Sequence, residues 1–518
     1  MFPQCRCSTS HKNLQNLLIP LREWKRFYKK SIHWTKYENR DFPRYRALTH
    51  FDDFYKNIYG EKLWRSLRLG LLCNNKYCAV VNNFSEPDAV KENLQNRGAL
   101  NMRELLALVE EKREERSETA VKKVSSEEGS LERRMEEAIE ASAKRDLISG
   151  TYSKYDYVNV LDEHYKDAKP PEKKDEPKET EEPKEYEGKL SLAEGIKDAH
   201  IDHRRIINIK DGLSTSTLYE FVPASKIKGI DRIMSETAQL EFYKQSVDFP
   251  INVEKQLSIT FPEHLDIYSY EKCNVTSFPH PERGRTGVFD FYLLDGASIL
   301  PVLALDLKPG DRLLDMCGAP GGKSMTAFQT LSLDELVCND SFKSRVNRIS
   351  RIVKEYLYNC PQKERFKISH RNGLNMTERD LYNKILVDVP CTNDRRSVNK
   401  DEGNWFETNR MQQRLRLPEL QADLLTNALR LVAPGGTVVY STCSLSPVQN
   451  DGVVQMALKN LWEENEYEFV VQDMTEAFRP AEVLYCFGEN VGLKYGIVVL
   501  PHLTANFGPL YFSKIVKK

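Results

Sequence analysis

The second half of the chain alternates short apolar runs with amphipathic stretches, and this alternation limits the fold more than any other feature of the sequence. The apolar runs occupy residues 312–316, 335–338, 385–389 and 436–441. Stretches with a helical period lie between them, for example 341–356 and 419–432. Continuously apolar strands separated by helices are typical of a parallel sheet covered on both faces. Residues 286–518 are therefore predicted to form a doubly wound α/β domain that binds its ligands at the carboxyl ends of the strands.

The first 36 residues differ from the rest of the chain in charge. Glu23 is their only acidic residue. Four leucines among them have the spacing of one helix face: Leu14, Leu17, Leu18 and Leu21. A basic, amphipathic and nearly acid-free start is typical of a mitochondrial transit peptide, so residues 1–36 predict import into the mitochondrial matrix. The alternatives are a basic surface arm or a nuclear signal around Lys25 and Arg26.

Three further parts precede the α/β domain. Residues 37–102 contain aromatic and aliphatic clusters and are predicted to form an ordered, mainly helical N-terminal region. Residues 103–200 are predicted to be a charged helical or disordered insertion, because the Pro/Glu/Lys tract at 168–188 has too few apolar side chains to offset chain entropy. Residues 201–285 form a pre-catalytic region of short apolar runs.

The cysteines and the hydropathy exclude several classes of protein. The chain has 11 cysteines at scattered positions and no CxxC pair, which favours reduced intracellular thiols over a disulfide framework or a zinc ribbon. No metal site is predicted. No apolar run approaches the ~18 residues that a membrane-spanning helix requires, so no membrane association is expected.

A glycine-rich loop with the sequence CGAPGGKS follows the first apolar run, at 317–324. A phosphate-binding loop needs glycine where this chain has Cys317, and the dinucleotide pattern GxGxxG is absent. A loop for S-adenosylmethionine remains, and it requires an acid at the end of the next strand. Asp340 has that place and suits two ribose hydroxyls, although a helix N-cap is the alternative. Asp315, at the end of the first strand, is placed to orient the methionine part.

Two cysteines follow two other predicted strands. Cys391 ends the tetrad 388–391, DVPC, and Cys443 lies in the tetrad 441–444, STCS. Both tetrads lie at carboxyl ends of parallel strands, where a doubly wound domain has its site. Two buried thiols that merely cap strands are the alternative interpretation.

The glycine loop and the two tetrads together resemble the motifs of the Nop/Sun (RsmB, Fmu-type) family of RNA cytosine-5 methyltransferases. The resemblance covers about 286–518, including the closing residues 505–512, and extends in places to 51–85. Within the family, the chain is most similar to the mitochondrial ribosomal-RNA members. The resemblance implies a Rossmann-like class I S-adenosylmethionine-dependent methyltransferase domain that methylates mitochondrial small-subunit ribosomal RNA.

The resemblance also assigns site residues. It implies catalytic roles for Cys443, Cys391, Asp388 and Lys323. The residues implied in binding S-adenosylmethionine are Asp315, Cys317, Gly318, Ala319, Pro320, Gly321, Gly322, Lys323, Asp340, Asn372 and Asp388. For Lys323, an exposed lysine at a helix start is the alternative.

Cytosine chemistry explains why this site would need two thiols and an acid. The C5 atom of cytosine is too electron-poor to accept a methyl group until a thiolate adds at C6, and the resemblance assigns this attack to Cys443. Asp388 is expected to protonate or hydrogen-bond N3, and Cys391 to help release Cys443. Because the thiolate is the reactive form, the pKa of Cys443 is expected to be lowered. The target base must be single-stranded or flipped out.

Two positions depart from the family pattern. Asn372 stands where an aspartate usually contacts the adenine region, so a hydrogen bond but no charge is available there. Gly318 replaces the commoner alanine, a change that we expect to be tolerated.

Contacts to RNA are predicted from two groups of basic residues. They are Arg345, Arg348, Arg351 and Lys354 on one stretch, and Arg395, Arg396, Arg410, Arg414 and Arg416 after the Pro-Cys tetrad. Solvated helix faces would give the same pattern. The formal net charge is −1, with nine basic and two acidic residues at 1–40 and 19 basic and 27 acidic residues at 101–200. The remainder is balanced, which predicts weak non-specific RNA binding.

Two alternatives to methylation of mitochondrial ribosomal RNA remain. The same chemistry on mitochondrial tRNA is one alternative. The other is an RNA-binding factor of ribosome biogenesis in which methylation is dispensable. The family resemblance further implies a helical-repeat partner of the mTERF type and contact with the small ribosomal subunit.

Overall fold

The computed structural model describes residues 42–125, 235–245, 249–358, 360–464, 467–488 and 491–518, and for 114–125 only the backbone. The expected transit peptide and the Pro/Glu/Lys tract lie outside these residues. The chain separates into two compact units, one of 1–107 with 227–518 and one of 108–226. The first unit contains every residue discussed below. In the second, the described residues belong to the later part of helix α4 (Met102–Ser125).

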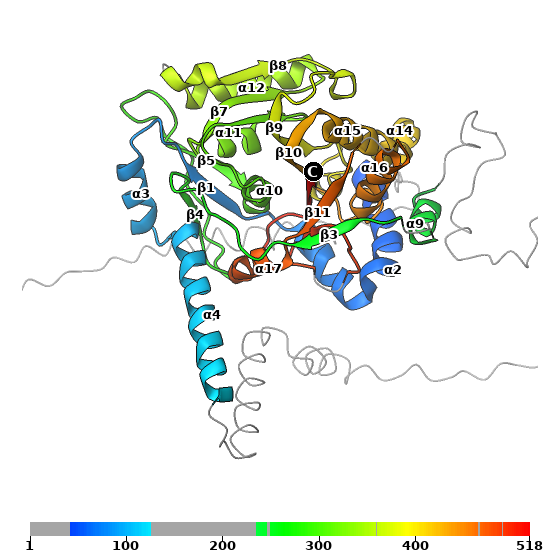
Figure 1. The fold of residues 1–518 in the computed structure, drawn as a ribbon, viewed down its shortest axis with the longest axis horizontal. Coiled ribbons are helices and arrows are strands. Elements are labelled where there is room, and N and C mark those ends of the chain that lie inside the picture. Colours follow the sequence, from blue (N-terminus) through cyan, green and yellow to red (C-terminus); the bar gives the residue numbers. More distant parts are fainter. Residues whose placement is uncertain (1–41, 126–234, 246–248, 359, 465–466, 489–490) are drawn as a thin grey trace, which may run out of the picture. The chain divides into compact units, whose positions relative to one another are not determined.

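A nine-stranded sheet dominates the described part of the first unit (Figure 1). Its order is β3-β11-β13-β10-β9-β6-β7-β8, and β12 pairs with β13. The strands are β3 (Asn252–Lys255), β6 (Asp311–Asp315), β7 (Leu333–Asn339), β8 (Phe366–Ser369), β9 (Tyr382–Asp388), β10 (Val432–Thr442), β11 (Phe469–Asp473), β12 (Ile497–Val499) and β13 (Leu510–Lys517). Strands β10, β9, β6, β7 and β8 run parallel, and β13 is antiparallel to β10. The predicted doubly wound α/β fold is confirmed.

Helices cover both faces of this sheet, and successive strand residues contribute to two different cores. Leu313 and Leu386 belong to the core that also contains residues of α10 (Leu300–Ala304), α11 (Gly322–Phe328), α12 (Lys343–Tyr356) and α17 (Thr475–Phe478). Leu314 and Ile385 belong to the core with α15 (Leu417–Leu431) and α16 (Asp451–Glu464). Because side chains alternate across a strand, a strand that is apolar at every position is buried on both faces.

The strand order reverses between β6 and β9. From β6 the chain builds β7 and β8 on one side, and β9 and β10 then follow on the other side. In sheets of this kind, ligands usually bind at such a reversal, which here lies at the carboxyl ends of β6 and β9. Asp388 on β9 pairs in register with Ser441 on β10, so the two tetrads lie side by side at that edge.

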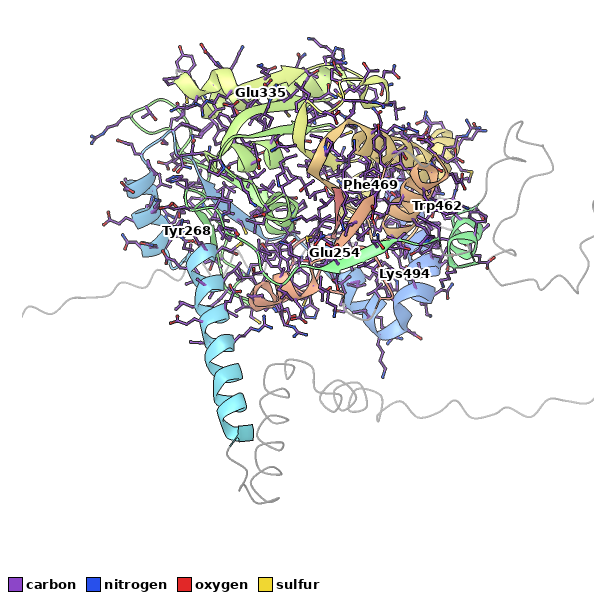
Figure 2. All side chains as sticks on the ribbon, viewed as in Figure 1. Glu254, Tyr268, Glu335, Trp462, Phe469 and Lys494 are labelled. Atoms are coloured by element: carbon purple, nitrogen blue, oxygen red, sulfur yellow. The ribbon has the colours of Figure 1, made fainter. Side chains whose placement is uncertain are left out.

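An ion-pair cluster centred on Glu335, which is labelled in Figure 2, connects strands β6, β7 and β8. Glu335 on β7 binds Arg312 of β6 at 2.9 Å and Lys367 of β8 at 2.7 Å.

The expected helical N-terminal region is present, and a second sheet of four antiparallel strands accompanies it. Helices α2 (Pro43–Leu72) and α3 (Pro87–Asn96) are present as expected, but Val80 and Val81 lie in a strand. The sheet has the order β2 (Leu100–Asn101), β4 (Ile267–Ser269), β1 (Tyr77–Val81) and β5 (Phe291–Asp295). Strand β1 pairs with residues 187 to 218 positions away in the sequence, which no local pattern reveals.

This sheet takes strands from the parts expected at 37–102, 201–285 and 286–518. The expected boundaries themselves stay a prediction. The other α-helices in the described part of the chain are α9 (Glu236–Gln245), α13 (Asp394–Asn399) and α14 (Met411–Leu415). Short 3₁₀ turns occupy Gly296–Ile299, Pro361–Arg365, Gly373–Asn375, Thr408–Arg410 and Arg479–Val483. None of the described helices is both long and apolar enough to cross a bilayer.

Candidate active site

The glycine loop passes from the end of β6 into α11. The N–H of Gly318 donates to the carbonyl of Asn339 at the end of β7, at 2.7 Å. Gly321 is the N-cap of α11 and has φ of 116°, which only glycine adopts without strain. A Cβ on Gly318 would lie 2.4 Å from the sulfur of Cys338, so that sulfur occupies the space of the family's alanine methyl. This arrangement explains how the chain accommodates glycine at that position.

Asp315 contributes a buried carboxylate beneath this loop. Ser324 Oγ donates to its Oδ2 at 2.5 Å, whereas Oδ1 is buried without a hydrogen-bond partner among the described residues. Burial raises the pKa of Asp315 to about 7, and the nearby charge of Asp388 acts in the same direction. A buried acceptor without a donor is costly. The ammonium group of a bound amino acid would satisfy it, so Asp315 fits the methionine part of S-adenosylmethionine.

Asp340 and Asn372 lie at the ends of the next two strands, and each caps a local turn. Asp340 Oδ1 accepts from the N–H of Phe342 at 2.9 Å, and Asn372 Oδ1 accepts from the N–H of Leu374 at 3.1 Å. Asp340 is buried and Asn372 is exposed. Each of the two side chains therefore stabilises a local turn, in addition to any role that it has in binding ribose or adenine.

Asn339 was missed by the sequence analysis. Its amide donates to the carbonyls of Met316 at 2.9 Å and Arg371 at 3.0 Å, and its Oδ1 accepts from the N–H of Arg371 at 2.9 Å. It thereby holds the end of β6 and the segment before Asn372 together. A polar residue at the end of an apolar strand was the available signal.

Lys323, which is buried, and Asp388, which is partly exposed, form an ion pair between α11 and the end of β9. Lys323 Nζ lies 2.6 Å from Asp388 Oδ2, and Ser441 Oγ donates to Oδ1 at 2.8 Å. Burial alone would lower the pKa of Lys323. The negative charges of Asp388 and of Cys443 as a thiolate outweigh burial and raise this pKa. The alternative of an exposed lysine is wrong, because only 7% of Lys323 is exposed. Ser441 is a further residue that the sequence analysis did not single out.

The two cysteines are neighbours. The N–H of Cys443 donates to the sulfur of Cys391 at 3.2 Å. The expectation of a lowered pKa for Cys443 is wrong for the protein described here. The hydrogen bond with Cys391 and burial raise the pKa of Cys443, and only Lys323 opposes them. In this arrangement the Cys443 thiol is protonated.

Several arginines predicted to bind phosphate instead have partners inside the protein. Arg395 donates to the carbonyls of Gly70, Cys73 and Gly508, at 2.7 to 2.8 Å. Arg414 pairs with Glu236 at 2.8 Å and is 10% exposed at its side chain. These two residues are structural. In the α12 group, Arg345 pairs with Asp340 at 3.8 Å, which leaves the exposed Arg348, Arg351 and Lys354 as the residues expected to contact RNA.

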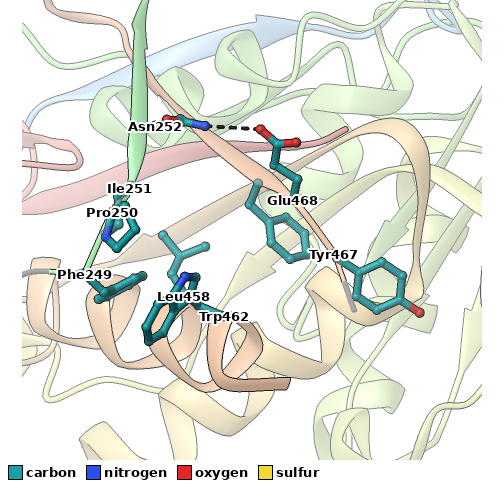
Figure 3. A pocket seen from close by; sticks show the side chains of 9 residues that line it. Phe249, Pro250, Ile251, Asn252, Leu458, Trp462, Tyr467 and Glu468 are labelled. Carbon is teal, nitrogen blue, oxygen red and sulfur yellow. Dashed lines mark hydrogen bonds between the residues drawn. The ribbon is translucent and has the colours of Figure 1, made fainter. Parts of the chain in front are cut away.

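A hollow among the described residues lies away from these motifs, between β3 and α16 (Figure 3). Its volume is about 340 Å³, and Phe249, Leu458 and Trp462 line its apolar floor. None of the motif residues contributes to it.

Comparisons with known proteins agree with the motifs. A family model described as 16S rRNA methyltransferase RsmB/F matches residues 302–511. The 5-cytosine rRNA methyltransferase nsun-4 of Caenorhabditis elegans is 32% identical over 484 residues, which cover 92% of each chain. The 5-cytosine rRNA methyltransferase NSUN4 of Bos taurus is 41% identical over 49% of this chain and 66% of the relative. A mitochondrial tRNA (cytosine(34)-C(5))-methyltransferase of Mus musculus is 32% identical over 48% of this chain and 70% of the relative.

Proposed function

The chain belongs to the Nop/Sun (RsmB/F) family of S-adenosylmethionine-dependent RNA cytosine-5 methyltransferases, and from this premise we propose that its substrate is mitochondrial small-subunit ribosomal RNA in the matrix. Coverage is the observation that carries the choice of ribosomal RNA. The worm relative named as an rRNA methyltransferase aligns with 92% of both chains, whereas the mouse tRNA methyltransferase aligns with 48% of this one. The 16S description of the matching family model supports the small subunit. The basic residues 1–36 support mitochondrial import.

S-adenosylmethionine supplies the methyl group as an electrophilic sulfonium. We assign its methionine part to Asp315, whose buried Oδ1 accepts no hydrogen bond from the described residues, and to the loop from Cys317 to Gly322. Asp340 is assigned to the ribose and Asn372 to the adenine region. Because Asn372 already uses its oxygen in a turn, its amide nitrogen is the group left to bind the base.

The thiols and Asp388 divide the work on the cytosine ring. The sulfur of Cys443 bonds to C6, and the electron pair of the C5–C6 double bond moves toward N3. Asp388 passes to N3 the proton that Cys443 loses, which keeps the ring neutral. Cys391, in contact with Cys443, assists the later loss of the C5 proton and the expulsion of Cys443.

Lys323 has a positioning and an electrostatic role in this scheme. Its ammonium holds Asp388 at 2.6 Å, and its charge favours the thiolate form of Cys443. The raised pKa of the free Cys443 thiol then has a simple consequence. A raised pKa disfavours the free thiolate, so the thiol is expected to lose its proton as its sulfur adds to C6.

Variants of the two cysteines test the assignment. With RNA and cofactor, Cys391→Ala is expected to accumulate a covalent protein–RNA adduct, visible as a shifted band on a denaturing gel. Cys443→Ala is expected to abolish the adduct. An adduct that persists in Cys443→Ala would show that another residue is the nucleophile.

The substrate requires a separate experiment. Bisulfite sequencing of mitochondrial RNA with and without the protein should show one 5-methylcytosine lost from small-subunit rRNA. Loss from a mitochondrial tRNA instead would favour the alternative represented by the mouse relative. If Cys443→Ala restores ribosome assembly without any 5-methylcytosine, the protein acts as an assembly factor in which methylation is dispensable.

Partners also belong to the proposal. From the family resemblance, we propose that an mTERF-type helical-repeat protein and the small ribosomal subunit bind this chain. The balanced charge of its body is consistent with a need for a partner. A balanced body supplies little of the phosphate attraction that dominates RNA affinity.

A further inference from the structure

Asp394 lies three residues after Cys391, at the start of α13, and its side chain is wholly buried. Sequence analysis assigned no role to it. A buried carboxylate is costly unless hydrogen-bond donors surround it. The donors around Asp394 therefore show which segments it holds.

Asp394 joins the two loops that carry the cysteines, here called the Pro-Cys loop (389–394) and the Thr-Cys loop (443–446). From the Pro-Cys loop, Thr392 Oγ1 donates to Asp394 Oδ1 at 2.6 Å. From the Thr-Cys loop, the N–H of Leu445 donates to Oδ2 at 2.7 Å, and Ser444 Oγ lies 3.2 Å from Oδ1. The carboxylate thus accepts hydrogen bonds from both loops.

Backbone contacts continue this connection to the nucleophile itself. The N–H of Asp394 donates to the carbonyl of Cys443 at 3.1 Å. Beyond the ends of β9 and β10 the two loops are outside the sheet, so the sheet does not determine their separation there. The distance between the Cys391 and Cys443 sulfurs depends on these side-chain and backbone bonds.

A third segment reaches the same carboxylate from far away in the sequence. Tyr55 of α2 donates its hydroxyl to Asp394 Oδ2 at 2.7 Å, and both side chains are buried. Helix α2 also packs closely on α13. The N-terminal region therefore contributes directly to the geometry of the two cysteine loops.

We propose that Asp394, supported by Tyr55, is a positioning residue that holds the Cys391–Cys443 pair in its reactive geometry. The inference rests on the proposed role of Cys443 as nucleophile. A displacement of about 1 Å in a reacting group costs on the order of 100-fold in rate. Removing the carboxylate should therefore slow the chemistry while leaving RNA binding unchanged, because Asp394 is buried and cannot contact RNA.

The test compares Asp394→Ala with Asp394→Asn, using RNA that carries 5-fluorocytosine at the target. Fluorine at C5 cannot leave as a cation, so each competent enzyme stops as a covalent adduct. The amplitude counts folded, competent sites, and the rate reports the geometry of the thiols. For Asp394→Ala we expect an adduct rate about 100-fold lower with an unchanged KM for RNA. Asp394→Asn keeps the shape and, after rotation of the neighbouring hydroxyls, its bonds, so it should lose less than about tenfold.

Asp266→Ala is the matched control. Asp266 is also buried and forms ion pairs with Lys91 and Arg103, but it directly precedes strand β4 of the four-stranded sheet. It should lower the adduct amplitude and leave the rate per competent site unchanged. Tyr55→Phe should lower the rate by about tenfold, the value of one hydrogen bond to a charged group.

Two different failures are distinguishable. If the wild-type protein forms no adduct with the fluorinated RNA, the proposed mechanism fails before Asp394 is tested. If the wild-type protein forms the adduct and Asp394→Ala forms it at the same rate per competent site, the positioning role is wrong and Asp394 serves stability alone.

Discussion

At the scale of single residues, the chemistry depends on how burial changes ordinary ionisation. Cys443 and Cys391 form a hydrogen-bonded pair. This hydrogen bond and burial raise the pKa of Cys443, which favours the protonated thiol. Only the ammonium of Lys323 acts in the opposite direction. A reactive thiolate is also the form most easily oxidised. A raised thiol pKa therefore limits the amount of thiolate that is open to oxidation.

Asp315 leads to a prediction about pH. Burial raises its pKa to about 7, so the carboxyl is charged above that pH and neutral below it. The ammonium of the cofactor needs the charged form. The affinity for S-adenosylhomocysteine, which retains the amino-acid part, should therefore rise as the pH increases from 6 to 8, as measured by isothermal titration calorimetry.

Asp315→Asn is the matching variant for that measurement. It should bind the ligand more weakly at pH 8, and its affinity should change little between pH 6 and 8. A wild-type affinity that is flat across this range would contradict the assignment of the ammonium group to Asp315.

At the scale of single elements, α12 carries the basic face best placed to contact RNA. Arg348, Arg351 and Lys354 are all exposed on this helix, whose apolar residues Ile349 and Val353 are buried. Arg348→Glu with Arg351→Glu should raise the KM for RNA at least tenfold and leave kcat at saturating RNA unchanged. The salt dependence of binding should weaken by about one ion per lost phosphate contact.

Lys459→Glu on α16 provides the control for α12, because Lys459 is also exposed and basic. It should change neither the KM nor the salt dependence. An unchanged KM in the α12 double variant would show that this helix face is only solvated.

A buried ion cluster attaches α9 to α2 and α14. Glu236 binds His50 and lies 2.8 Å from Arg414. Burial alone would raise the pKa of Glu236, but His50 and Arg414 lower it to about 2. A lowered carboxyl pKa stabilises the fold above the unfolded value of 4.5, and this stability is lost as the pH falls toward 2.

Glu236→Gln tests this attachment. At pH 7 it should cost about 3 kcal/mol in the free energy of urea unfolding, because it leaves Arg414 buried without its partner. The difference from wild type should shrink as the pH falls below about 4.5. A difference that is constant from pH 7 to pH 3 would exclude the ionised carboxylate as its source.

At the scale of the whole molecule, the net charge of −1 conceals three parts of different charge. Residues 1–40 have an excess of basic groups, 101–200 an excess of acidic groups, and the rest is balanced. A protein of residues 42–518 should therefore bind unrelated RNA with a Kd no tighter than about 1 μM at physiological salt. Nanomolar, strongly salt-dependent binding in a filter assay would contradict the need for local basic surfaces or a partner.

Much of the fold was predictable because its signals are local. Strands β6, β7, β9 and β10 are continuous apolar runs, and each motif directly follows one of them. The four-stranded sheet was not predictable, since β1 pairs with β4 and β5 across long intervals of chain. Arg395 was misinterpreted for the same reason, because one of its acceptors, Gly70, is 325 residues away.

The sequence by itself determined the fold class, the family, and the positions of the two cysteines and the ion pair at strand ends. Spacing and residue type are sufficient for these, because parallel strands bring their carboxyl ends to one edge. Only the tertiary structure decided that Cys443 is held protonated, that Lys323 is buried, and that Asp394 connects both cysteine loops to α2. Ionisation and side-chain positioning depend on burial and on contacts between distant segments, and neither is encoded in any short stretch of sequence.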